Sequence, residues 1–267
     1  MTNIMRYLAL SVVLLLAASA STGIKAQSSP DEVAQNIEIV RRWLAISTSS
    51  DLAGAEDLLA AQHTQHIVDG TSVLPPAQRL EEIRKRRGVG GRVTLHQVDL
   101  FGQRDKVCVL YSAQTSTGPR SGVEVYRVTA SKIAETWVDS QARGTLWKWD
   151  PAPNGDSSPP ANEQVFRRWY EDIYPKADWQ SVPGVAGPIF VRHETEEFEM
   201  SADEYGQRLR TLFARTGPLR FEYEVIAGAD KIAVIGRGAS GRGFLQAWRV
   251  RDGKLVDSWW APGGAAW

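Results

Sequence analysis

Two histidines with similar surroundings in the sequence are the residues best suited to chemistry. The chain has four histidines in 267 residues, and His66 and His193 lie 127 positions apart (193 − 66 = 127). A neutral imidazole near pH 7 can take a proton from a carbon beside a carbonyl group, or relay one between two groups. We predict a catalytic role for both. The alternative is a pair of structural histidines held by hydrogen bonds.

Two carboxylates could share that work. Residues 132–140 are expected to form a strand, and alternation along it puts Glu135, Trp137 and Asp139 on one face. We predict Glu135 and Asp139 as further catalytic groups. A similar stretch later in the chain carries Asp257 and Trp259 at the places of Glu135 and Trp137.

A neighbouring expected strand could line a ligand pocket together with the strand over residues 132–140. Glu124 and Tyr126 share a strand face, and the matching positions later in the chain are Gln246 and Trp248. This difference favours the first half as catalyst and the second as binder of an apolar ligand. The alternative is an exposed acid with a tryptophan packed under helices. The residues predicted to contact a ligand are Glu124, Tyr126, Trp137, Tyr223, Trp248, Asp257 and Trp259.

Metal and nucleotide motifs are weak. His63, His66 and Asp69 would share one face only if they lay on a helix, and zinc requires another firm ligand in fixed geometry. The glycines at 236, 238 and 241 match GxGxxG, but a strand-like run follows them where a dinucleotide site needs a helix. We therefore predict neither a metal nor a cofactor.

The stretches of sequence expected to position these residues occur twice in the chain. Lys132-Ile-Ala-Glu-Thr-Trp137 returns as Lys254-Leu-Val-Asp-Ser-Trp259, and the two stretches are 122 positions apart (254 − 132 = 122). Other matches recur at offsets of 122 to 127. This period indicates two copies of one domain of about 110 residues. We assign the copies to residues 29–149 and 161–267, with a proline-rich linker over 150–160.

Each copy places helices before strands. In the first, helices are expected from Ser29 to about Leu44, over 51–61 and after Pro76, and strands over 92–101, 106–114, 122–129 and 132–140. In the second, helices are expected over 161–174 and from Ser201, and strands over 219–227, 231–236, 244–250 and 254–260. This is an α+β pattern. We predict two cone-shaped domains, each a curved antiparallel sheet wrapped on N-terminal helices, packed as an internal pseudo-dimer.

A family resemblance follows from these motifs. Helices, a histidine-bearing segment and hairpins ending in a Lys-Ile-x-Glu-x-Trp strand resemble the nuclear transport factor 2-like superfamily, and most of all its SnoaL-like polyketide cyclase branch. The segment Gln65-His-Ile-Val-Asp-Gly70 is similar to that branch's histidine segment. The resemblance implies a small-molecule pocket and a cofactor-free cyclase, isomerase or dehydratase. It also implies an Asp general base after the strand's Trp, whereas Val138 and Trp260 stand there in this chain.

The charge totals and the N-terminal residues limit the possible partners and cellular location of the protein. Lys plus Arg and Asp plus Glu are equal at 31 each, so no basic footprint for nucleic acid exists. Arg6, the apolar run over 7–18 and Ala18-Ser-Ala20 indicate a signal peptide over residues 1–20, the alternative being an uncleaved anchor. We expect a periplasmic or secreted protein with no membrane attachment after cleavage.

Three functions are compatible with this sequence. The first is an enzyme acting on a small apolar carbonyl compound, with His66 moving the proton. The second is a non-catalytic small-molecule binding protein, which the missing Asp favours. The third is an envelope protein-interaction module, because fold alone does not fix function.

Overall fold

The first domain combines helices with a seven-stranded sheet. The computed structural model describes residues 29–67, 70–87, 92–138, 142–150, 158–215, 219–238, 241 and 243–260. The first domain comprises α1 (Pro30–Thr48), η1 (Glu56–Leu58), β1 (Leu59–Ile67), β2 (Gly70–Leu74), α2 (Pro76–Arg87), β3 (Thr94–Gln103), β4 (Lys106–Thr115), β5 (Gly118–Thr129), β6 (Lys132–Val138) and β7 (Ala142–Arg143). Ser29 caps α1 by accepting a hydrogen bond from the Glu32 amide, as its position before Pro30 predicts.

The second domain repeats this order with a six-stranded sheet. It comprises α3 (Pro159–Arg167), η2 (Arg168–Ile173), α4 (Tyr174–Lys176), η3 (Trp179–Gly184), β8 (Ala186–His193), β9 (Glu197–Ser201), α5 (Ala202–Phe213), β10 (Phe221–Ala227), β11 (Lys231–Gly238), β12 (Gly243–Arg251) and β13 (Lys254–Trp259). The expected capping box is present: Ser201 and Glu204 satisfy each other's amides at the start of α5. The α+β class and the two tandem domains are confirmed.

The two sheets have one topology. Their strand orders are β2-β1-β6-β5-β4-β3, with β7 beside β5, and β9-β8-β13-β12-β11-β10. The expected sheets were antiparallel, and all but one pair in each sheet are: β1 with β6, and β8 with β13, run parallel. In each domain the histidine-bearing segment is itself a strand, β1 or β8, and it runs parallel to the strand that carries the Lys-x-x-x-x-Trp motif, β6 or β13.

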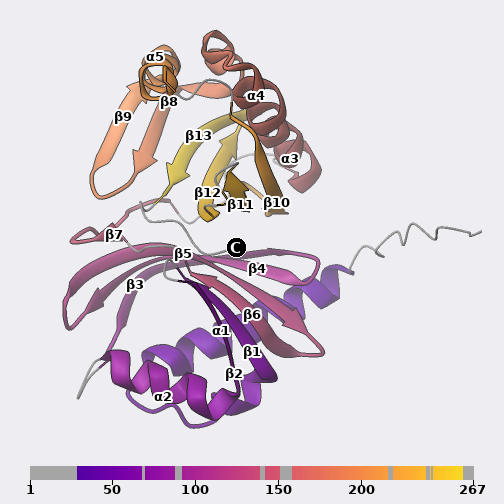
Figure 1. Cartoon of the computed structure of the whole chain (residues 1–267), viewed down its shortest axis with the longest axis vertical. Coiled ribbons are helices and arrows are strands. Elements are labelled where there is room, and N and C mark those ends of the chain that lie inside the picture. The colour runs from indigo at the N-terminus through magenta and orange to yellow at the C-terminus, as the bar shows by residue number, and fades with distance from the viewer. Residues whose placement is uncertain are drawn as a thin grey trace, which may run out of the picture.

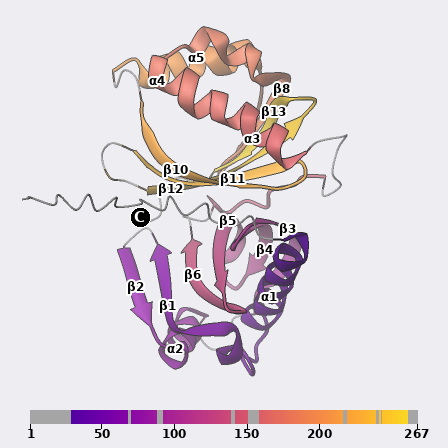
Figure 2. The same cartoon turned by 90° about the vertical axis from the view of Figure 1, so that its right-hand side faces the viewer.

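Each sheet has one face covered by its own helices and one face turned to the other domain (Figure 1). Figure 2 shows the helices of the two domains at opposite ends, with both curved sheets between them. On the helix-covered face of the first sheet, a buried cluster joins Val40 and Leu44 of α1 to Val109, Tyr111 and other strand residues. We call the face covered by helices the helix-side face, and the face turned to the other domain the interdomain face.

The interdomain faces form a shared apolar core. One buried cluster combines Val125 and Trp137 of the first domain with Ala247 and Trp259 of the second. Cys108 also lies in this cluster and is fully buried. Burial raises the pKa of its thiol well above the usual value, so this cysteine is a packing residue rather than a nucleophile.

A bulge decides which face each residue of β6 occupies. The register of β5 and β6 shifts between Arg127 and Val128. Because of this extra residue, Ile133 packs under the helices while Trp137 packs against the second domain. Strict alternation would put these two side chains on the same face.

Several sequence expectations need correction or lie outside the described residues. The helix expected over 51–61 is only the short η1, and the chain is already a strand from Leu59. His63 and His66 therefore lie on a strand rather than on one face of a helix. The signal peptide over 1–20, most of the linker, Asp69 and Asp139 lie outside the described residues. Among the described helices, none is long and apolar enough to cross a bilayer.

Candidate functional site

A carboxyl group set between two tyrosines lies on the helix-side face of the first domain. Glu124 and Tyr126 of β5 lie on this face, and the Tyr126 hydroxyl donates a hydrogen bond to the Glu124 carboxylate. The Tyr111 hydroxyl of β4 donates a second one. Tyr126 in turn accepts a hydrogen bond from the indole of Trp43 on α1. These contacts hold the carboxylate in one orientation.

A glycine makes room for one of those tyrosines. Gly122 is the direct cross-strand partner of Tyr111. A Cβ atom at Gly122 would lie 3.0 Å from the Tyr111 hydroxyl oxygen and 3.1 Å from Cζ. The ring of Tyr111 therefore lies over the backbone of β5, and its hydroxyl reaches Glu124 two residues further along. A glycine is required here for close approach, not for its backbone angles.

The environment shifts the titration of this carboxyl group. Burial raises the pKa of Glu124, and the hydrogen bonds from Tyr126 and Tyr111 oppose that rise without cancelling it. Burial and the neighbouring Glu124 charge raise the pKa of Tyr126 well above its usual value, so its phenol stays a donor at neutral pH. Glu124 retains partial exposure, as does Val138 opposite it. This end of the strand pair is therefore within reach of solvent.

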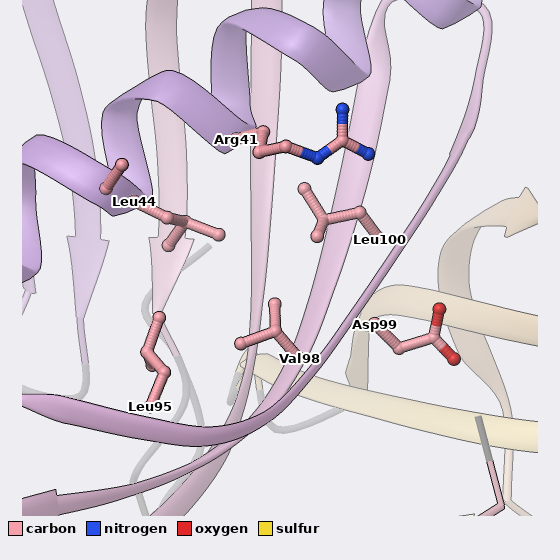
Figure 3. Close-up of a pocket in the computed structure, with 7 residues that line it drawn as sticks. Arg41, Leu44, Leu95, Val98, Asp99 and Leu100 are labelled. Carbon is pink, nitrogen blue, oxygen red and sulfur yellow. The ribbon is translucent and has the colours of Figure 1, made fainter.

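An open groove of about 480 Å³ lies between α1 and β3 of the same domain. Figure 3 shows Leu44, Leu95, Val98 and Leu100 around this space, with Arg41 at its edge. Val98 is the direct cross-strand partner of Tyr111. The aliphatic wall of the groove and the Glu124 carboxyl group therefore share one neighbour, the side chain of Tyr111.

In the second domain, aromatic side chains fill the equivalent interior. The glycine and aromatic residue have exchanged strands: Gly236 now lies opposite Phe244, where Tyr111 lies opposite Gly122. A Cβ atom at Gly236 would lie 2.3 Å from Phe244 Cζ. Phenylalanine brings no hydroxyl group.

The residue corresponding to Glu124 is also neutral in the second domain. Gln246 occupies that place, and its Oε1 accepts a hydrogen bond of 3.0 Å from Tyr170. Tyr170 packs with Phe166, Tyr223 and Phe244 through close ring contacts. The equivalent place of this domain therefore has an amide in place of the acid, and Gly236 and Trp248 stand where the first domain has Tyr111 and Tyr126.

The predicted residues His66, Glu135 and Trp137 gather on the other face, toward the second domain. The His66 ring stacks on Trp137 with centroids 5.1 Å apart. Its Nε2 lies 2.6 Å from Glu135 Oε1, and its Nδ1 lies 2.9 Å from Thr71 Oγ1. Burial works to raise the pKa of Glu135, but the hydrogen bond with His66 and the charge of Arg127 outweigh it and lower that pKa. Both ring nitrogens are thus engaged.

The second domain repeats this arrangement with His193, Asp257 and Trp259. The His193 ring stacks on Trp259 at 5.1 Å. His193 Nε2 lies 3.2 Å from Asp257 Oδ1, and Nδ1 lies 3.1 Å from a Glu197 carboxylate oxygen. Glu197 is the cross-strand partner of His193, as Thr71 is of His66. The predicted partners are thus brought together, and the place is the interdomain face rather than a pocket under helices.

Ion pairs cross between the domains in a reciprocal pattern. Lys106 Nζ of β4 lies 2.7 Å from Glu224 Oε1 of β10, and Lys231 Nζ of β11 lies 2.7 Å from Asp99 Oδ2 of β3. The offset is the same for both partners (231 − 106 = 125 and 224 − 99 = 125). Each lysine side chain is almost fully buried. The repeat therefore extends to the contacts between the domains.

The two remaining predicted ligand contacts lie in the second domain's aromatic interior. Trp248 is buried there, and Tyr223 packs at its edge and donates a hydrogen bond of 2.6 Å to Glu171. Of the predicted set, only Glu124 and Tyr126 join the site of the first domain.

Tyr111, Gly122 and Trp43 were not predicted. An alignment of the two copies, with offsets of 125 for Tyr111 (236 − 111 = 125) and 122 for Gly122 (244 − 122 = 122), could have found these two residues, because glycine and the aromatic residue exchange strands between the copies. Among the described residues, no group of three His, Cys, Asp or Glu side chains is arranged to hold a metal ion.

Comparisons with known proteins found matches among solved structures. Neither a protein-family model nor a curated protein matches the chain. Similar solved structures include a SnoaL-like protein of unknown function from Burkholderia thailandensis (20% identity, 39% of this chain and 96% of that one, TM-score 0.35). A polyketide cyclase candidate from Xanthomonas campestris pv. campestris (12%, 40% and 91%, 0.36) and a ketosteroid isomerase candidate from Kribbella flavida (11%, 45% and 86%, 0.36) are also similar. These neighbours are of the class that the sequence resembles. At such scores, function is inferred below from the residues of the site alone.

Proposed function

We propose that the first domain is a cofactor-free enzyme in which Glu124 moves a proton on a small apolar carbonyl compound. The observation that carries the proposal is the position of this group. Glu124 lies directly opposite Val138, the residue that stands where the family resemblance places an Asp base. The acid is therefore on the neighbouring strand, on the same helix-side face.

The surroundings of Glu124 suit a general base. Burial raises the pKa of its carboxyl group, which makes the ionised form a stronger base and brings its pKa closer to the working pH. The hydroxyl groups of Tyr111 and Tyr126 fix the carboxylate without neutralising it. The aliphatic groove beside Tyr111 supplies apolar surface for the rest of a ligand.

His66 and His193 have a different place in this proposal. Both lie on the interdomain face, stacked on tryptophan and hydrogen-bonded to carboxylates. We assign them, with Glu135 and Asp257, to holding the two domains together as an internal pseudo-dimer. The reciprocal lysine pairs support this assignment, because an isologous contact repeats each interaction about a twofold axis. A catalytic role for these groups stays a prediction from sequence.

The second domain is proposed to act as a support. Its interior is filled by aromatic rings, and Gln246 replaces the acid. A non-catalytic binding function for the whole chain is the alternative, and the same groove favours it. Export to the periplasm or the medium also remains a proposal, which N-terminal sequencing of the protein from its host would test by locating the cleavage site.

Proton exchange tests the catalytic proposal without knowledge of the natural substrate. 1-Indanone, a small apolar ketone, is incubated with the protein in D₂O, and deuterium uptake beside the carbonyl is followed by NMR. We expect exchange above the buffer rate, and a loss of about 100-fold or more in Glu124→Gln. Glu135→Gln is the matched control on the opposite face and should keep the wild-type rate. Exchange no faster than buffer, or undiminished in Glu124→Gln, would contradict the proposal.

A further inference from the structure

A buried chain of polar side chains leads from α2 to the strand beside Glu124. Arg79 of α2 donates from Nε to Nδ1 of His63 at 3.0 Å. His63 Nε2 lies 2.9 Å from Oγ1 of Thr136 on β6. The three residues are 1%, 2% and 4% exposed. Because the three side chains are buried, water does not compete for the hydrogen bonds between them.

Because Arg79 can only donate, it determines which atom donates and which accepts in both hydrogen bonds of this series. A guanidinium group only donates, so His63 Nδ1 accepts and the ring proton lies on Nε2. Burial and the Arg79 charge lower the pKa of His63 to about 4, which keeps the ring neutral at neutral pH. His63 Nε2 therefore donates to Thr136 Oγ1. Within the described part of the chain, the Thr136 hydroxyl has this one hydrogen bond, so its own proton is left to donate.

Thr136 lies on the same face as Glu124, one step deeper in the domain. It is the cross-strand partner of Tyr126, and Val138, two residues later, is the partner of Glu124. Diagonal neighbours of this kind are about 7 Å apart in an antiparallel sheet. A carbonyl oxygen at Thr136 would leave the adjacent carbon near Glu124.

We propose that Thr136 is the hydrogen-bond donor for the carbonyl oxygen of the ligand, with His63 and Arg79 as positioning residues. This inference rests on the proposed function and names its substrate class: a neutral, enolisable ketone or aldehyde. Glu124 takes a proton from the carbon beside the carbonyl, and the electron pair of that C–H bond moves toward the oxygen. Thr136 stabilises the charge on oxygen by a hydrogen bond without transferring its proton. Glu124 then returns the proton to carbon.

The infrared stretch of a bound carbonyl group tests this donor. 1-Indanone labelled with ¹³C at the carbonyl is bound to the full chain, and the frequency and the affinity are measured for Thr136→Val, Thr136→Ser and Thr136→Ala. We expect a lowered frequency in wild type and Thr136→Ser. In Thr136→Val and Thr136→Ala the lowering should vanish and binding should weaken by about 3- to 10-fold. Thr64→Val, on the neighbouring strand β1 and the opposite face, is the control.

The outcomes separate this inference from the proposed function. An equal frequency and affinity in Thr136→Val would overturn the donor, as would absence of a lowered frequency or of binding in wild type. A lowered frequency that depends on Thr136, without any proton exchange, would overturn the proposed catalysis and leave the donor standing. A Thr136→Val variant that does not fold is replaced by Thr136→Ala against Thr136→Ser.

Discussion

Glu124 and Val138 face each other across the antiparallel pair of β5 and β6. The residue expected to be an acid is aliphatic, and its partner on the next strand is the acid. Side chains directly opposite each other lie about 5 Å apart at Cβ, so a carboxyl group from either strand can serve much the same space. A missing motif residue is therefore compatible with a retained proton-transfer site in the first domain.

The first prediction concerns His66. Because its ring lies on the interdomain face and both nitrogens are engaged, His66→Ala should change the rate of proton exchange on 1-indanone by less than about 3-fold. It should lower the melting temperature, since it removes the hydrogen bond to Glu135 and the stacking contact with Trp137. Rate and melting curves of the same preparations check this. A lost rate with an unchanged melting temperature would instead favour His66 as the catalyst.

The second prediction concerns the crossing lysines. Lys106→Met should lower the free energy of unfolding by about 1 to 3 kcal/mol, because it leaves Glu224 without the cation it pairs with across the domains. The Glu224 side chain is 43% exposed, which keeps the value at the lower end. A double-mutant cycle with Glu224→Gln should give a coupling energy of about 1 kcal/mol. The cycle of Lys231 and Asp99 serves as comparison, and additivity in both cycles would show that the pairs do not hold the domains.

The third prediction is a pH dependence set by His63. Its folded pKa is lowered to about 4 from 6.5, so the unfolded chain binds more protons between those values. Stability should therefore fall as the pH drops from 6.5 toward 4, on the order of 2 to 3 kcal/mol in all. Urea unfolding at several pH values measures it. His63→Gln, neutral throughout, should show a flatter curve, and parallel curves for the two proteins would rule out this cause.

The fourth prediction concerns Gly122. In Gly122→Ala the new methyl group would press on the Tyr111 ring, so the ring must move and its hydroxyl leaves Glu124. Proton exchange should fall several-fold, with a stability cost of about 1 kcal/mol. Tyr111→Phe separates the two effects: it should reduce exchange similarly with the ring still in place. Wild-type exchange in both variants would show that Tyr111 does not orient the carboxyl group.

The limits of prediction from sequence are visible in single residues. The offset between His66 and His193, and between Trp137 and Trp259, predicted two copies of one domain, and the order of helices before strands predicted the α+β class. The stacked pairs confirm that the equivalence is structural. Which face they occupy depends on a bulge beside Arg127. No residue type in the stretch demands one, so alternation alone could not place Trp137 relative to Ile133.

The candidate site was predicted only in part for a related reason. Glu124 and Tyr126 stand two residues apart on one strand, which alternation places together. Tyr111 and Gly122 come from different strands, so their contact depends on the β4–β5 register. Thr136 and His63 meet through a parallel strand pair that was not expected. Local patterns carry little information on such pairings.

A crystal structure of the full chain with 1-indanone bound tests the central claim most directly. We predict the ketone on the helix-side face of the first domain, with its oxygen within hydrogen-bond distance of Thr136 Oγ1 and its methylene carbon against the Glu124 carboxylate. A ketone bound at the interdomain face beside His66 or His193, in the second domain, or nowhere in the chain would contradict it.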